Sequence, residues 1–148
     1  MARRDRGECE RCKLVFAYEL LHSGFGDFKY AYCDTCGMTA TFDSWNTWVS
    51  RISALTKGIG EIEPSAEPFL LPCQCGGHFQ SGSLPRCPIC KMPISADFAA
   101  GYLERNALGS MKGWRWQRNW SGAYCIVIED PNSMGVLRIR KDPVQKMR

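Results

Sequence analysis

The sequence lacks most of the residues and motifs on which common enzyme classes depend. Its 148 residues include two histidines, His22 and His78. It contains no His-Glu-x-x-His motif, no glycine-rich phosphate loop ending in lysine, and no Gly-x-Ser-x-Gly nucleophile elbow. These absences exclude the usual metalloprotease, nucleotide-binding and serine hydrolase sites. We therefore predict that the protein is not an enzyme, with no catalytic residues, and we infer no small-molecule substrate.

Long apolar runs are also missing. The longest candidates, Leu14 to Leu21 and Ala123 to Ile128, are far shorter than the roughly 18 residues that a membrane-spanning helix needs. The N-terminal sequence, Met-Ala-Arg-Arg-Asp-Arg-Gly-Glu, contains no apolar stretch that would serve as a signal peptide. We therefore predict a cytoplasmic protein with no membrane segment, in which paired thiols stay reduced.

The net charge is small, at +4, but it is unevenly distributed. Residues 105–148 carry nine Lys or Arg against three acids, whereas residues 1–104 carry ten against twelve. A basic C-terminal end favours an anionic partner, although it is also typical of a solvated surface that keeps a protein soluble.

The nine cysteines are the most informative feature of the sequence. Eight fall into close pairs, which are Cys9 and Cys12, Cys33 and Cys36, Cys73 and Cys75, and Cys87 and Cys90. In a reducing compartment such pairs are typical of metal sites, because a tight turn directs both sulfurs at one ion and zinc takes four ligands in a tetrahedron. We predict two structural Zn²⁺ ions bound by these eight cysteines. Either site also suits iron, which the same four thiolates accept.

Two assignments of the cysteine pairs remain open. In the sequential assignment, the first two pairs share one ion and the last two pairs share the other. In a cross-braced assignment, Cys9 and Cys12 share an ion with Cys73 and Cys75. We favour the sequential assignment because its loops are shorter. His78 is an alternative ligand for the second ion, whereas the lone Cys125 lies in an apolar run and is predicted to be a buried thiol.

Three of the cysteine motifs resemble the zinc-ribbon and rubredoxin-like group. They are Cys9-Glu-Arg-Cys12, Cys33-Asp-Thr-Cys36-Gly37 and Cys87-Pro-Ile-Cys90. In that group, two such turns at the ends of hairpins hold one metal ion. Cys73-Gln-Cys75 is one residue shorter, and the following Gly76-Gly77 gives its backbone freedom to compensate. The resemblance implies a metal and a fold element, but no activity.

Hydrophobic patterning and turn residues predict an α+β fold. We expect two small zinc-stapled, zinc-ribbon-like β-hairpin units, each followed by a helix, and a C-terminal β-hairpin. The first predicted unit covers 1–60, with a hairpin over 14–32 and a helix over about 44–57. A linker or connecting loop follows over 61–69. The second unit covers 70–148, with a helix over about 96–108 and a hairpin over 123–140.

Sequence alone leaves more than one role open for such a protein. We favour a protein-binding adaptor or regulatory protein, because metal-stapled loops present a rigid surface to a protein partner. A nucleic-acid-binding role is the alternative, since aromatic and basic side chains alternate in one segment and such faces stack on bases. Its contacts would be Lys112, Trp114, Arg115, Trp116 and Arg118. A weaker alternative is a redox sensor that releases metal when its thiolates are oxidised.

Overall fold

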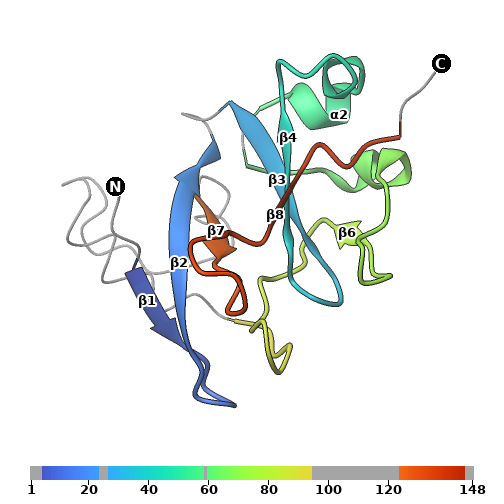
Figure 1. Ribbon diagram of the computed structural model, residues 1–148. Helices are drawn as coiled ribbons and strands as arrows, with labels where there is room; N and C mark the ends of the chain where they lie inside the picture. Colours follow the sequence, from blue (N-terminus) through green and yellow to red (C-terminus); the bar gives the residue numbers. More distant parts are fainter. Residues whose placement is uncertain (1–4, 24–26, 59, 95–123, 146–148) are drawn as a thin grey trace, which may run out of the picture.

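The computed structural model describes residues 5–23, 27–58, 60–94 and 124–145. Two β-sheets form its body (Figure 1). The first sheet is antiparallel, in the order β1-β2-β7, and consists of β1 (Asp5–Glu8), β2 (Val15–His22) and β7 (Tyr124–Ile128). The second sheet has the order β5-β3-β4-β8, with β6 also paired to β3, and consists of β3 (Phe28–Cys33), β4 (Thr39–Asp43), β5 (Gly60–Glu61), β6 (Phe79–Gln80) and β8 (Ile139–Lys141).

Helical structure among the described residues is short. It includes the 3-10 turn η1 (Val49–Arg51), the single-turn helix α2 (Ser53–Thr56) and the 3-10 helix η2 (Pro64–Phe69). The α+β class predicted from the sequence is confirmed at this level of detail. No helix among these residues is long and apolar enough to cross a membrane.

The predicted helix over 44–57 is wrong in its length and start. Asn46 orders the turn before η1, because its Oδ1 accepts the backbone N–H groups of Trp48 and Val49 at 2.8 and 3.2 Å, and η1 itself begins at Val49. Ile52 is extended, with φ −108° and ψ 101°, and separates η1 from α2. Two short turns therefore bury Val49, Ile52 and Leu55, the apolar residues that had suggested one continuous helix.

The first predicted hairpin connects the two sheets instead of pairing its own strands, and the C-terminal hairpin pairs its strands only next to its turn. β2 pairs with β1 and β7, whereas β3 pairs with β4, so the chain passes from the first sheet to the second between them. The C-terminal turn is closed by a bridge between Glu129 and Leu137. Beyond it, however, β8 pairs in parallel with β4 of the second sheet. Pairing with more distant strands buries these apolar strands more completely than two isolated hairpins would.

The segment over 61–69, predicted as a linker or connecting loop, contains the end of β5 and all of η2. Ile62 and Ala66 are buried in a cluster with Val49, Leu55 and residues of β4. The segment therefore packs into the core. The predicted helix over 96–108 and the Trp- and Arg-rich segment over 112–120 lie outside the described residues.

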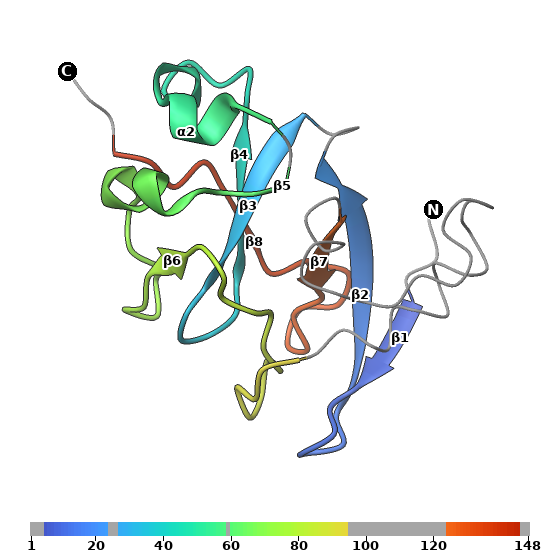
Figure 2. The same cartoon turned by 180° about the vertical axis from the view of Figure 1, so that it is seen from behind.

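β7 lies between β2 and the second sheet (Figures 1 and 2), and side chains of the second sheet bind its free edge. The Tyr32 hydroxyl accepts the backbone N–H of Ile126 at 2.8 Å, and the Thr39 hydroxyl donates to its carbonyl at 3.1 Å. Both backbone groups are thus satisfied without a neighbouring strand. Cys125 is buried beside Tyr32, as predicted, and burial raises the pKa of its thiol to about 12.

The half-buried carboxyl of Asp43, next to Asp142 near the C-terminal strand, provides a test of these contacts. Burial, and secondarily the charge of Asp142, raise the pKa of Asp43 above its ordinary value. The folded state therefore holds this proton more tightly than the unfolded state, so this contribution to stability is complete at low pH and is lost as pH rises through the raised pKa. We expect Asp43→Asn to stabilise the protein at pH 7 by roughly 0.5 kcal/mol. Paired urea melts at pH 7 and at lower pH should show the gain shrinking with acidity.

Asp142→Asn is the matched control for this substitution. The Asp142 carboxylate accepts the backbone N–H of Asp43 at 2.8 Å and the side-chain amide of Asn46 at 2.9 Å. The side-chain NH₂ group of an asparagine at this position would face one of these two N–H donors and could not accept from it. This variant should therefore lose about 1 kcal/mol of unfolding free energy. Equal effects of the two variants would contradict the assignment of the unfavourable charge to Asp43.

Candidate metal centres

The eight paired cysteines come together in two groups of four. Site 1 contains Cys9, Cys12, Cys87 and Cys90, and site 2 contains Cys33, Cys36, Cys73 and Cys75. Within each group the Sγ atoms all lie within 4.8 Å of one another. The pairs are therefore nested, the first with the fourth and the second with the third. The predicted sequential assignment is wrong, and the cross-braced alternative is also not the one observed.

The sulfur separations fit a tetrahedral metal ion. In site 1, Cys9 and Cys90 are 3.5 Å apart at sulfur and Cys12 and Cys87 are 3.6 Å apart. In site 2 the corresponding separations are 3.5 Å for Cys33–Cys75 and 3.6 Å for Cys36–Cys73. Four sulfurs at about 2.3 Å from one ion would be about 3.8 Å apart, whereas a disulfide requires about 2.05 Å. Each group can therefore hold a metal ion, consistent with a zinc-ribbon-like group.

Three of the four cysteine turns share one backbone pattern, which we call the long knuckle. In the knuckle that begins at Cys33, the N–H of Gly37 donates to the Cys33 carbonyl at 3.1 Å, and the N–H of Cys33 donates to the Met38 carbonyl at 2.9 Å. The same two bonds occur in the knuckles that begin at Cys9 and Cys87. The fifth residue of each long knuckle has a positive φ, and these residues are Lys13 (64°), Gly37 (74°) and Lys91 (64°).

The turn at Cys73-Gln-Cys75 repeats this pattern with one residue fewer. Here the N–H of Gly76 donates to the Cys73 carbonyl and the N–H of Cys73 donates to the Gly77 carbonyl, both at 2.9 Å. The positive φ, 94°, falls on Gly76, one position earlier than in the long knuckles. The glycines therefore allow a shorter turn to direct two sulfurs at the same point, which is the compensation predicted from the sequence.

Backbone N–H groups favour one thiolate in each site. The N–H of Cys12 is the main cause that lowers the pKa of Cys9 to about 6, against the effect of burial. Burial raises the pKa of Cys75, but the Gly77 N–H, 3.4 Å from its Sγ, and the neighbouring thiols lower it to about 7. For Cys12, the Leu14 N–H lowers the pKa, but burial and the other thiols raise it to about 11. A metal ion would displace the remaining protons of each group.

Asp34 joins the two knuckles of site 2, a role that sequence analysis missed. Its Oδ1 accepts the backbone N–H of His78 at 2.9 Å and the hydroxyl of Thr35 at the same distance. The His78 N–H is the main cause that lowers the pKa of Asp34. An acidic residue directly after the first cysteine of a knuckle was the available signal, but its partner is 44 residues away in sequence.

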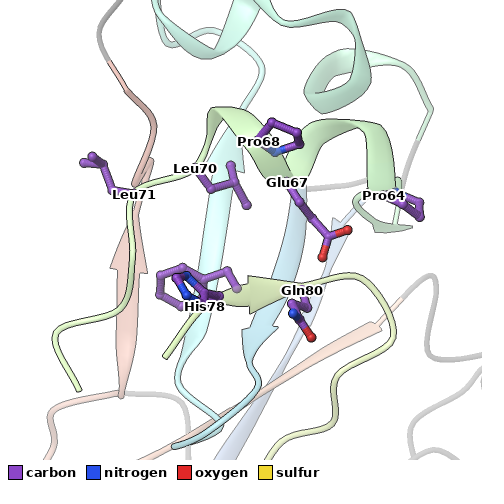
Figure 3. Close-up of a pocket in the computed structure, with 8 residues that line it drawn as sticks. Pro64, Glu67, Pro68, Leu70, Leu71, His78 and Gln80 are labelled. Carbon is purple, nitrogen blue, oxygen red and sulfur yellow. The ribbon is translucent and has the colours of Figure 1, made fainter. Parts of the chain in front are cut away.

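His78 is not one of the donors of site 2. It lines an open pocket of about 390 Å³ between η2 and β6, together with Glu67, Leu70 and Gln80 (Figure 3). His22 lies in β2, paired with Tyr124 of β7. Within the described part of the chain, both groups of donors therefore consist of cysteine alone.

Sheet topology explains why the nested assignment prevails over shorter loops. β3 leads directly into Cys33, and β6, which follows the Cys73 knuckle, pairs with β3 through Cys33 and Phe79. That pairing brings the second and third cysteine pairs together. The loop-closure argument that favoured sequential sites is weak, because each doubling of loop length costs only about 0.6 kcal/mol. The free energy gained from strand pairing and from burial of apolar side chains readily exceeds that difference.

The residues predicted to contact nucleic acid, Lys112, Trp114, Arg115, Trp116 and Arg118, lie outside the described residues. Their role stays a prediction from sequence.

Comparisons with known proteins identify a family, without a function. No curated protein and no solved structure matches the chain. A family model with the description "Domain of unknown function (DUF8255)" matches residues 5–96. The match covers more than half of the chain and includes all eight cysteines of sites 1 and 2. The chain therefore belongs to this family of domains of unknown function, DUF8255.

Proposed function

We propose that the protein is a non-catalytic zinc-binding interaction module in which sites 1 and 2 each hold one structural Zn²⁺. The observation that carries the proposal is the convergence of eight sulfurs, from four separate turns, into two groups whose closest separations are 3.5 to 3.6 Å. Chance proximity of thiols would not repeat the same knuckle geometry around both groups.

Four thiolates saturate a tetrahedral ion. A catalytic zinc instead has three protein ligands and an open position for water. A closed shell of this kind supports a structural role, in which the metal replaces part of the core that a small protein lacks. Iron in either site would have the same donors, and its visible absorption would distinguish it from colourless zinc.

Exposed apolar side chains beside site 1 support a protein partner. Val15 follows the first knuckle directly and is 62 % exposed, and Ile89 lies within the knuckle of Cys87 and is 56 % exposed. Site 1 brings these two knuckles together, since sulfurs of one lie 3.5 and 3.6 Å from sulfurs of the other. Apolar groups held rigidly at a surface are typical of protein-binding modules. This arrangement supports the adaptor role.

The nested assignment is tested by removing two ligands at a time. Because Cys12 and Cys87 belong to the same site, we expect Cys12→Ser/Cys87→Ser to lose one bound metal and to retain the other. Native mass spectrometry of the full chain, purified from its own host, measures the metal stoichiometry and any retained partner together.

Cys12→Ser/Cys33→Ser is the matched control, since it also removes two thiols but takes one from each site. It should weaken both metals. If the sites were sequential, Cys12→Ser/Cys87→Ser would weaken both metals, and Cys12→Ser/Cys33→Ser would remove one metal and retain the other. A wild-type chain that is folded and contains no transition metal would overturn the proposed function itself.

A further inference from the structure

The two metal sites are in direct contact through Gly37 and Arg86. Gly37 is the residue with positive φ that closes the Cys33 knuckle of site 2. A Cβ atom at this position would lie 2.6 Å from Cβ and 2.9 Å from Cα of Arg86, and would also overlap its backbone nitrogen. Real Cβ atoms do not approach other atoms this closely. Gly37 therefore packs against the main chain of Arg86 with no free space between them.

Arg86 in turn belongs to site 1. It directly precedes the ligand Cys87, and it forms a β-bridge with Pro93 across the base of the same knuckle. Its guanidinium donates to the Lys91 carbonyl at 2.9 Å, which fixes the side chain to that knuckle as well. A shift of Cys87 on metal binding would therefore move the surface on which Gly37 rests.

A second, independent link passes through Arg138. Its guanidinium donates to the carbonyl of Cys36, a site 2 ligand, at 3.1 Å. Its backbone N–H donates to the Ile128 carbonyl at 2.8 Å, and Ile128 packs in the same apolar cluster as Cys9 and Cys87. Site 2 is thus connected to the core around site 1 on two sides.

We infer that sites 1 and 2 are energetically coupled, so that metal in either site raises the affinity of the other. The inference rests on the proposed function, since it concerns the same two ions. Each knuckle becomes ordered when its metal binds, and the two knuckles share a contact surface that fits only when both are in their final geometry. Coupling of this kind is reciprocal, and couplings between protein sites are typically 5- to 150-fold in affinity.

The test compares two glycines that close the two knuckles of the same site. Gly37→Ala and Gly76→Ala both place a side chain at a positive φ in site 2, at 74° and 94°. A Cβ at Gly76 meets nothing within 4 Å, whereas a Cβ at Gly37 overlaps Arg86. Cd²⁺ is the probe, because ¹¹³Cd NMR gives one resonance for each tetrathiolate site and chelator competition gives the affinity of each. The resonances are assigned with Cys12→Ser and Cys75→Ser.

We expect Gly37→Ala to weaken Cd²⁺ binding at both sites, by at least fivefold at site 1, although no ligand of site 1 is changed. Gly76→Ala should lower the Cd²⁺ affinity of site 2 through backbone strain. The Cd²⁺ affinity of site 1 should stay within about twofold of wild type when site 2 is saturated with Cd²⁺, because saturation removes any effect of lower occupancy at site 2. If Gly37→Ala affects site 2 alone, the coupling is wrong. A wild-type chain that binds no Cd²⁺ at either site would instead refute the proposed function.

A second measurement applies if Gly37→Ala does not fold. Cys75→Ser removes an exposed ligand of site 2 and leaves the Gly37–Arg86 contact in place. With site 2 disabled in this way, the affinity of site 1 for Cd²⁺ should fall at least fivefold, and the reciprocal Cys12→Ser should lower the affinity of site 2. Unchanged affinities in both variants would overturn the inference.

Discussion

Removal of the metal by a strong chelator is expected to abolish the cooperative thermal unfolding of this protein. A structural tetrathiolate site contributes on the order of 10 kcal/mol to folding, which is comparable to the net stability of a whole domain, about 5–15 kcal/mol. Site 1 joins the β1–β2 segment to the chain around residue 90, and site 2 joins β3 to the chain around residue 75. Without both ions, these connections depend on short strand pairings and apolar clusters.

The measurement is circular dichroism during a thermal scan, before and after chelation, with metal content checked on the same sample. Addition of two equivalents of Zn²⁺ should restore the transition, which controls for irreversible damage to the thiols. If chelator-treated chain is verified as metal-free and still melts cooperatively at the original temperature, the ions do not hold the fold together.

Gly77→Ala is expected to be strongly damaging although it removes no ligand. A Cβ at Gly77 would lie 2.6 Å from the Thr35 hydroxyl, 2.7 Å from the Cys33 sulfur and 2.8 Å from the Asp34 carboxylate. These groups are held by the knuckle and by the Asp34–His78 hydrogen bond, so they cannot all move aside. We expect a loss of about 3 kcal/mol in unfolding free energy and the loss of the metal from site 2.

Gly135→Ala is the control for this prediction. Gly135 lies in the C-terminal turn with φ 82°, and a Cβ there meets nothing within 4 Å. An alanine at this position would therefore cause backbone strain of about 1 kcal/mol without a steric clash. Chemical denaturation and metal analysis of both variants separate the two effects. Similar losses in the two variants would show that the close approach at Gly77 has no particular importance.

The eight cysteines of the two candidate metal sites could be identified from the sequence because their pairing into turns depends on local geometry. Two residues between cysteines, as in Cys9-Glu-Arg-Cys12, direct both sulfurs to one side of a turn regardless of what surrounds it. Gly76 and Gly77 likewise indicated how the shorter Cys73 turn compensates. The strand character of the runs after Cys12 and before Cys33 followed from their hydrophobic patterning, which is also a local property.

The partners of these elements could not be predicted in the same way. The apolar pattern over Trp45 to Leu55 fitted one amphipathic helix, yet the chain breaks at Ile52 and leaves Trp45 69 % exposed. The periodicity of a sequence shows which residues are apolar, but it does not show which other part of the protein packs against them. Similarly, the residues over 14–32 were predicted to form one hairpin, but its two strands pair in different sheets.

Local sequence thus determined that this chain has four cysteine turns suited to a metal and mixed α and β structure, because spacing and side-chain chemistry act over a few residues. Only the tertiary structure decided which turns share an ion. Cys12 and Cys87 lie 75 residues apart, and their sulfurs meet because distant strands pair and bury apolar surface between them. The free energy of that burial far exceeds the small extra entropy cost of closing a long loop, and no local pattern in the sequence reports it.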